Sequence, residues 1–354
     1  MTGRGRHASP RSPPRKNPML TRRSLLTAPL ALALAGCGRP PSPSGTSPTP
    51  GGSAAGPFKV GLITTGGLTD GGWNALAGQA LERMKTELGA DVSHQAAGAA
   101  VAEETLRSFG RDGYRLVFAH GTEFKDAARL AAEEHAETVF VVSSGDVKAA
   151  NLASLRFDLG EASYLAGMAA AALSKTGKAG QIGGQPFPPV EQAFALFTRG
   201  GKAIREDFTA PITYVGNWED ANAAKEKALA MIRGGADVIF QNADAAGEGV
   251  FVAAEGAKER RVLVIGSNAN QNALKPEIIA ASAVLDVPKT FLSVARDVKA
   301  GTFTGDVFRQ DLKSGNVYLA VNPAFESQIP PDVRRKMEQA EADIKAGRLK
   351  LVAA

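Results

Sequence analysis

Residues 60–82 read VGLITTGGLTDGGWNALAGQALE, and this stretch gives the strongest indication of the fold. The apolar run at 58–63 is typical of a buried strand, and apolar residues three and four apart from Trp73 onward predict a helix that ends at Gly89. A glycine-rich loop separates the two. Strand, loop and helix in this order form the unit of an open parallel sheet, whose ligands bind beyond the carboxyl ends of the strands.

The loop at 64–74 contains the first candidate ligand-binding residues. Asp70 is an acid, Trp73 a flat aromatic and Asn74 an amide, and the glycines beside them let backbone N–H groups approach a ligand. These glycines form neither a GxGxxG motif nor a P-loop, so neither a dinucleotide nor a triphosphate is favoured. In the alternative interpretation, Trp73 is a core residue and Asp70 caps the helix.

Residues 1–37 have the features of an export signal. They contain seven Lys or Arg and no Asp or Glu, and the apolar run at 28–35 fits a signal-peptide core but is too short to span a bilayer. The run ends in Leu34-Ala35-Gly36-Cys37, which resembles a bacterial lipobox with a lipidated cysteine. We therefore expect Cys37 to anchor the protein on the extracytoplasmic side of the cell membrane. A stray cysteine after an ordinary signal peptide is the alternative.

The composition of the remaining chain excludes several classes of site. Cys37 is the only cysteine, which rules out an intramolecular disulfide and a metal site built on paired thiolates. The whole chain has a formal charge of +5, but the residues after the leader hold 34 basic and 36 acidic side chains. Because the basic excess lies in the leader, we expect no nucleic-acid partner. The Gly, Pro and Ser-rich segment at 38–57 is expected to be a tether.

About 300 residues follow the tether, enough for two lobes of ordinary domain size. Short β-branched runs alternate with Ala-rich amphipathic segments, which predicts an α/β fold with parallel sheets flanked by helices. Candidate strands lie at 58–63, 115–119, 138–142, 178–182, 212–215, 236–240, 261–265 and 278–285. Further candidate helices lie at 126–134, 161–173, 190–206, 221–232 and 290–299.

Polar and glycine-rich residues follow most of these strands. If two such sheets face each other, the strand ends converge on one cleft between the lobes. Trp73 and Trp218, the only tryptophans, both lie at strand-to-helix junctions, one in each half of the chain. Across a cleft they would hold a flat ring between them, whereas packing of both in the core is the alternative. Further candidates at the strand ends are Phe187, Asn242, Asp244 and Asn268.

Several short motifs, each weak alone, are specific together. They are TDGGWN at 69–74, NLAS at 151–154, EASYLAG at 161–167, KTGK at 175–178, VGNWED at 215–220 and GADVIFQ at 235–241. This set resembles the basic membrane protein family of substrate-binding lipoproteins, which serve ABC importers and include purine nucleoside receptors. The resemblance covers residues 58–351.

The resemblance implies a two-lobed type I periplasmic-binding fold with three hinge crossovers, which closes on a ligand and docks on permease subunits. By position in the family motifs, Asp70 and Asn74 would hydrogen-bond a purine nucleoside, and Trp73 and Trp218 would stack on it. We expect a monomer without a cofactor or metal. The expected lobes are 58–157 with about 276–302, and 158–275 with about 303–354.

Two positions depart from the family pattern. Asn268 stands in SNANQ at 267–271, where many members have an acidic Val-Asp-x-Asp-Gln, and Asp286 stands where they have a lysine. The resemblance implies ribose recognition at both positions. A free purine base, or another flat heterocycle, is therefore an alternative ligand to a nucleoside.

Three other functions compete with an importer subunit. An enzyme is not expected, because no GxSxG, HExxH or phosphate loop is present and His120 is the only histidine that follows a strand. A lipoprotein that senses its ligand and signals to a membrane receptor would have the same cleft. A sugar would also stack on tryptophan in the same way.

Overall fold

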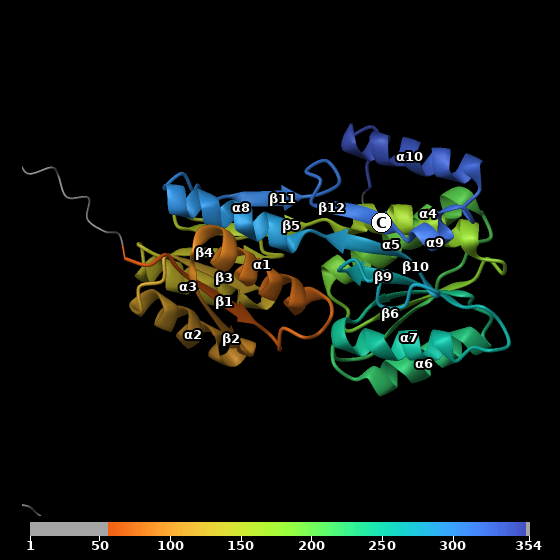
Figure 1. The fold of residues 1–354 in the computed structure, drawn as a ribbon, viewed down its shortest axis with the longest axis horizontal. Coiled ribbons are helices and arrows are strands. Elements are labelled where there is room, and N and C mark those ends of the chain that lie inside the picture. Colours follow the sequence, from red (N-terminus) through yellow and green to blue (C-terminus); the bar gives the residue numbers. More distant parts are fainter. Residues whose placement is uncertain (1–55, 352–354) are drawn as a thin grey trace, which may run out of the picture. The chain divides into compact units, whose positions relative to one another are not determined.

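The computed structural model describes residues 56–351. The predicted leader with Cys37, and most of the predicted tether, lie outside these residues. Within the described part of the chain, no helix is both long and apolar enough to cross a membrane. The described residues form two sheets flanked by helices, which is the predicted α/β class (Figure 1).

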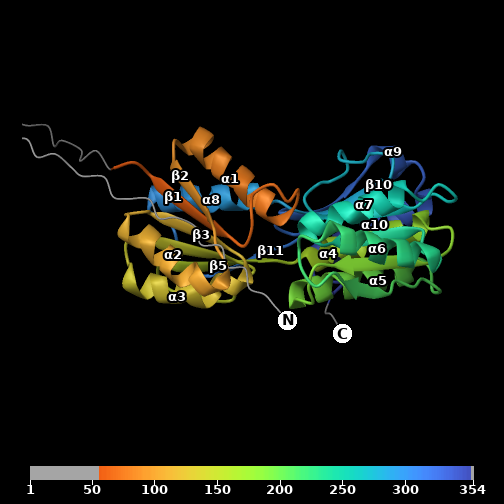
Figure 2. The same ribbon diagram turned by 90° about the horizontal axis from the view of Figure 1, so that it is seen from below.

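The first lobe is built on six strands, all parallel to their neighbours. The strands are β1 (Lys59–Thr64), β2 (Asp91–Ala96), β3 (Leu116–His120), β4 (Val139–Ser143), β5 (Leu152–Phe157) and β11 (Val307–Gln310). Its helices are α1 (Trp73–Leu88), α2 (Ala99–Arg111), η1 (Thr122–Phe124), α3 (Lys125–Glu134) and α8 (Val287–Ala300). The sheet order is β11-β5-β4-β3-β1-β2, with α1 and α8 on one face and α2 and α3 on the other (Figure 2).

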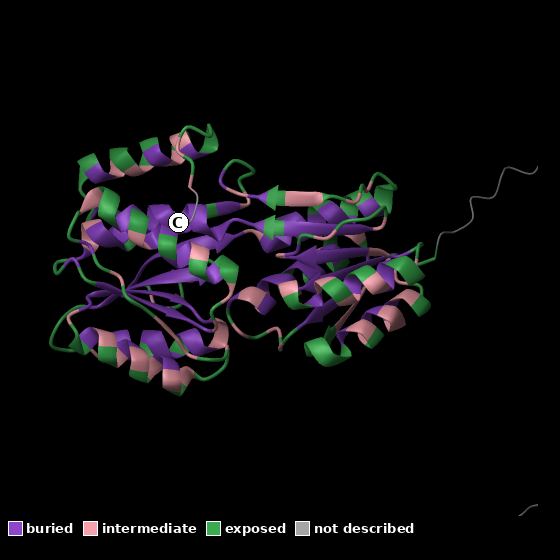
Figure 3. Ribbon diagram, turned by 180° about the vertical axis from the view of Figure 1, so that it is seen from behind, coloured by how far each residue is buried: buried purple, intermediate pink, exposed green. Residues whose placement is uncertain are grey.

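The second lobe repeats this plan with one antiparallel edge strand. The strands are β6 (Ala179–Gly183), β7 (Ile212–Tyr214), β8 (Val238–Asn242), β9 (Leu263–Asn268), β10 (Ile279–Leu285) and β12 (Val317–Val321). The helices are α4 (Leu159–Leu173), α5 (Pro188–Ile204), α6 (Ala221–Arg233), η2 (Asp244–Ala246), α7 (Gly247–Glu255), α9 (Pro323–Glu326) and α10 (Pro331–Lys345). The sheet order is β12-β10-β9-β8-β6-β7, and only β12 runs antiparallel to its neighbour. The strands of both sheets are mostly buried (Figure 3), because helices cover both faces.

The chain passes between the two sheets three times, after Phe157, Leu285 and Gln310. The predicted two-lobed fold with three crossovers is confirmed, but two predicted lobe boundaries are wrong. β10 pairs with β9 in the second sheet, and β11 pairs with β5 in the first. The second and third crossovers therefore lie later in the chain than residues 276 and 302. Every residue of β10 is buried, so the strand completes the core of the second lobe.

Arg309 links two of the crossovers. Its guanidinium forms ion pairs with Asp158, with Glu161 at 2.6 Å and with Asp311 at 3.2 Å. Asp158 follows β5 and Asp311 follows β11, so a single side chain joins two connecting segments. Burial raises the pKa of Glu161, and the Leu312 N–H and Arg309 offset part of this rise.

The helices α4 and α5 approach each other more closely than side chains normally allow. Thirteen of the fifteen residues of α4 are buried. A Cβ atom added at Gly167 of α4 would lie 1.9 Å from the carbonyl oxygen of Phe197, and one added at Gly200 of α5 would lie 1.9 Å from that of Tyr164. Glycine is therefore required at both positions for the backbones to touch.

We predict that Gly167→Ala destabilises the protein by about 1–3 kcal/mol, because the new methyl group must push α5 away. Denaturant unfolding of the purified variant measures this loss. Gly98→Ala is the matched control, since Gly98 has a φ of −74° and a Cβ atom added there would meet no other atom within 4 Å. An unfolding free energy at Gly167→Ala no lower than at Gly98→Ala would contradict the prediction.

Candidate ligand-binding site

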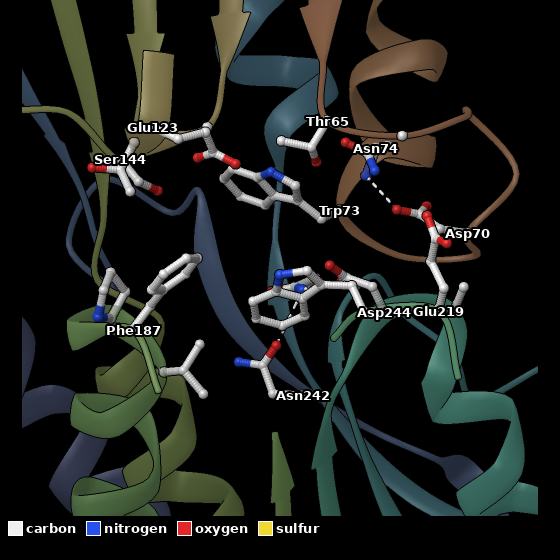
Figure 4. A pocket seen from close by; sticks show the side chains of 18 of the residues that line it. Thr65, Asp70, Trp73, Asn74, Glu123, Ser144, Phe187, Glu219, Asn242 and Asp244 are labelled. Carbon is white, nitrogen blue, oxygen red and sulfur yellow. Dashed lines mark hydrogen bonds between the residues drawn. The ribbon is translucent and has the colours of Figure 1, made fainter. Parts of the chain in front are cut away.

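A cavity of about 460 Å³ lies where the strand ends of the two lobes meet. Its volume falls within the range of about 300 to 1,000 Å³ that is usual for small-molecule sites. Figure 4 shows side chains from both lobes pointing into it. Of the nine predicted binding residues, eight line the cavity: Asp70, Trp73, Asn74, Phe187, Trp218, Asn242, Asp244 and Asn268.

Asp286 is the ninth predicted residue, and the structure places it outside the lining. It follows β10 at the second crossover and begins α8, where its carboxylate accepts the backbone N–H of Lys289 at 3.0 Å. The structure thus gives Asp286 the role of a helix cap and does not bring it into the cavity with the other eight residues.

The backbone of the cavity loops is locally strained. Among the described residues other than glycine, positive φ angles occur at Ser144 (59°), Asp244 (48°) and Asn268 (64°). All three line the cavity. Such conformations cost roughly 1–3 kcal/mol each and are concentrated at ligand sites and switch regions. The surrounding fold thus holds these three loops in a shape that serves the cavity.

Asp70 caps the first helix, which agrees with the alternative interpretation of the sequence. Its carboxylate accepts the backbone N–H groups of Gly72 at 3.1 Å, Asn74 at 2.8 Å and Ala75 at 2.8 Å. The Asp70 carboxylate therefore offsets the partial positive charge at the start of α1, and it also lines the cavity. Figure 4 shows Asp70 beside Asn74 at the edge of the site.

Trp73 both packs into the lobe and lines the cavity. Its indole stacks on the ring of His120, with centroids 3.9 Å apart and planes 17° from parallel. Phe157 contacts it edge-on at 6.2 Å. The indole is partly exposed and belongs to the cavity lining. Trp73 is therefore partly a packing residue of the first lobe, as the alternative interpretation holds, and its contact with a ligand stays a prediction.

His120 is fully buried behind Trp73 and stays uncharged. Burial lowers its pKa to about 3, and the hydrogen bond to the Trp73 carbonyl offsets only part of that effect. Because a carbonyl oxygen only accepts, Nε2–H donates to it at 3.0 Å, and Nδ1 accepts the hydroxyl of Ser143 at 2.8 Å. Both ring nitrogens are thus occupied, and His120 acts as a support for the indole.

Trp218 lines the cavity from the second lobe. A Cβ atom added at Gly184 would lie 2.0 Å from the indole, so the ring rests directly on the backbone of that glycine. Phe187 lies beside it, with ring centroids 5.9 Å apart. Aromatic surface therefore faces the cavity from both lobes.

Three polar side chains of the second lobe form a chain of contacts at the cavity. The amide nitrogen of Asn268 donates to Asp244 at 3.2 Å and lies 3.4 Å from the amide oxygen of Asn242. All three line the cavity, and Asn242 and Asn268 are almost completely buried. From the first lobe comes Asn74, which is 7% exposed and whose side-chain oxygen has no hydrogen-bond partner in the described structure. That oxygen is a free acceptor in a buried position.

Burial raises the pKa of Asp244, the charge of Asp70 raises it to a smaller extent, and the resulting pKa is about 7. The backbone N–H of Trp73 and the amide of Asn268 lower it in part, and Glu123 adds to the rise. Burial also raises the pKa of Glu123. The carboxyl groups at the cavity thus repel one another's charge.

Seven polar residues of the lining were not among the predicted binding residues. They are Thr65, Thr69, Thr122, Glu123, Ser144, Asn217 and Glu219. Each lies in a polar junction after a strand, so the signal was present in the sequence. Polar loop residues are common, however, and nothing local distinguishes those that face the cleft.

Two lobes with a cavity between them are the features of a solute-binding protein. The chain belongs to the family described as ABC transporter substrate-binding protein PnrA-like, whose model matches residues 58–346. It is 28% identical to a purine-binding protein of Brucella abortus, with 82% of each chain covered. It is also 28% identical to the ABC transporter nucleoside-binding protein BmpA of Lactococcus lactis, with 93% of this chain and 99% of that one covered.

Solved structures show the same fold. A solute-binding protein of an ABC transporter system from Aeropyrum pernix superimposes with a TM-score of 0.79 at 24% identity, over 84% of this chain and 94% of that one. Family membership confirms the resemblance drawn from the sequence motifs. The protein is thus an extracytoplasmic substrate-binding component of an ABC transporter, and it is not an enzyme. Membership of this family implies that it binds a small molecule and that its partners are permease subunits.

We predict that Asp244→Asn flattens the dependence of stability on pH. A carboxyl with a raised folded-state pKa contributes stability that is complete below pH 3.8 and is lost as the pH rises toward about 7. The variant carries no titrating group there. Its free energy of unfolding, relative to that of the wild type, should therefore rise by up to about 1.4 kcal/mol per pH unit across this window. Denaturant unfolding at several pH values measures the difference.

The opposite trend is expected at Asp343, whose pKa is lowered by hydrogen bonds from Gln339 and Arg348. Asp343→Asn is therefore a control of reversed sign. If the Asp244→Asn curve ran parallel to that of the wild type, the proposed burial of the Asp244 carboxyl would be wrong.

Proposed function

We propose that this protein is the lipid-anchored binding component of an importer for purines, and that it holds a purine nucleoside or free purine base between its lobes. In this proposal Cys37 carries the lipid, residues 38–57 form the tether, and the monomer delivers its ligand to the permease. Relatives named as purine-binding and nucleoside-binding support the class of ligand.

One observation carries the proposal: the only two tryptophans of the chain, Trp73 and Trp218, line one cavity from opposite lobes. A nucleobase stacked on an aromatic ring gains about 1–3 kcal/mol, and two rings give a flat ligand a contact on each face. His120 and Gly184 support the two indoles from behind. The aromatic surfaces are thus held in place before the ligand arrives, which reduces the entropy lost on binding.

Polar groups at the cavity would read the edge of the base. The free side-chain oxygen of Asn74 would accept an N–H of the ring or of an exocyclic amine, and burial makes an unmet acceptor there costly. Asn242 would present an amide from the other lobe. Asp286 lies outside the lining, and Asn268 already donates to Asp244. These two positions therefore give no reason to prefer the nucleoside over the free base.

Ligand binding would stabilise the contact between the lobes. The amide of Gln271 donates to the carbonyl of Gly71 at 3.3 Å, and a Cβ atom added at Gly72 would lie 3.2 Å from the Asp244 carboxylate. A ligand that touches both lobes binds the closed form better than the open form, and so shifts the population toward closure. The permease would then recognise the closed arrangement.

We predict that adenine, guanine, hypoxanthine or their nucleosides bind the purified chain, and that Trp73→Ala lowers the affinity at least tenfold because one stacking face is lost. Calorimetry gives the dissociation constants. Thermal shifts are a check, because a ligand at a concentration of a hundred times its dissociation constant stabilises the folded protein by about 2.7 kcal/mol. Tyr318→Ala, which removes an exposed aromatic ring of β12 outside the cavity, is the control. Absence of binding by every purine would refute the ligand class, and an unchanged affinity in folded Trp73→Ala would refute the site.

We predict that Cys37→Ser releases the exported protein from the membrane fraction. The lipid chains contribute about 0.8 kcal/mol per buried CH₂ group, and a serine at that position cannot carry them. Fractionation of cells that express wild type and variant, washed without detergent, measures the change. Ala35→Gly, a small-residue exchange two positions earlier, is the control. Retention of the Cys37→Ser protein on the membrane would exclude this anchor.

A further inference from the structure

The cavity is lined by acids and by no basic side chain. Asp70, Glu123, Glu219 and Asp244 all belong to its lining, whereas no Lys or Arg of the described residues does. The negative charges of Asp70 and Glu123 act on Asp244, because both of them raise its pKa in addition to the effect of burial.

The helix starts at the cavity offer little to an anion. Phosphates bind at helix N-termini through free backbone N–H groups and the positive end of the helix dipole. At α1 the Asp70 carboxylate already accepts three of these N–H groups, from Gly72, Asn74 and Ala75. A protein anion thus occupies the place that a phosphate would take.

At two helices of the second lobe, backbone N–H groups near the helix start are likewise missing or already bonded. The first two residues of α5 are Pro188 and Pro189, which have no N–H to donate. Just before α6 the side chain of Asn217 accepts the backbone N–H groups of Glu219 and Asp220 at 2.9 and 2.7 Å. Within the first turn of α6, the Asp220 carboxylate accepts the Ala223 N–H at 2.9 Å. Loop residues before both helices line the cavity.

The other lining groups favour a ligand with hydrogen-bond donors. The buried side-chain oxygen of Asn74, which has no partner in the described structure, requires a donor. The faces of Trp73 and Trp218 attract positive charge through their π systems. Acceptors and aromatic faces therefore meet at one cavity, without a cation among the described lining residues to balance them.

We propose that the cavity excludes anions and takes flat heteroaromatic molecules only in their uncharged or cationic form, so that it rejects phosphorylated derivatives of its own ligands. The flat ring comes from the proposed function, on which this inference rests. The selection by charge comes from the acids and from the occupied helix starts.

Two matched pairs test the selection by calorimetry on the purified chain: adenosine with adenosine monophosphate, and riboflavin with flavin mononucleotide. We expect the phosphorylated member to bind at least a hundredfold more weakly than its partner. Equal affinity within a pair would overturn the inference and leave the purine function intact. Binding of riboflavin alone, with rejection of its phosphate, would refute the purine function and support the inference.

A second measurement needs no ligand. Both tryptophans line the cavity, so quenching of their fluorescence by caesium and by iodide reports the charge around them. We expect the ratio of caesium quenching to iodide quenching to be higher for the protein than for free tryptophan amide. Glu219→Gln should narrow the difference, whereas Glu82→Gln, which removes an exposed acid of α1 outside the cavity, should not. A ratio of caesium quenching to iodide quenching no higher than that of free tryptophan amide would overturn the proposal.

Discussion

The stack of the Trp73 indole on the buried His120 ring is the contact on which the cavity depends. His120 ends β3 and Trp73 begins α1, so the 3.9 Å between their centroids fixes the distance of the helix start from the sheet. The ring of Phe291 also contacts His120, edge-on and with centroids 5.4 Å apart. Because burial keeps the imidazole neutral, both nitrogens form fixed hydrogen bonds and the ring cannot turn. One wall of the binding site is thus an extension of the core.

The hinge combines exposed and buried charge. Arg309 has a side chain that is 56% exposed, whereas that of its partner Asp158 is 4% exposed. Breaking such a pair leaves the buried carboxylate without compensation, while the guanidinium can return to water. The ion pairs of Arg309 therefore tie the segments after β5 and β11 to each other between the two lobes.

Much of the fold followed from the sequence because its strongest signals are local. The unit of β1, glycine loop and α1 was predicted from 60–82, and the rule that ligands bind at strand ends located eight of the nine candidates. Four strands were missed: β2, β5, β11 and β12. β2, β11 and β12 lie at sheet edges, where β2 is largely exposed and none of the first three residues of β11 is buried, whereas β5 is an inner strand whose apolar run is short. Asp286 is the one candidate outside the cavity lining, because a helix cap and a cavity residue look the same in a sequence. The choice between them depends on which way the chain turns after β10.

The late crossovers have a consequence for biosynthesis. The first lobe takes α8 and β11 from beyond residue 286, and Phe291 of α8 stacks on Phe118 of β3 at 4.0 Å. While the ribosome is still adding the middle of the chain, the first sheet therefore lacks a helix over one face and an edge strand. Partly made lobes of this kind expose apolar surface and tend to aggregate. Both lobes can therefore complete their cores only when nearly all of the chain has been synthesised.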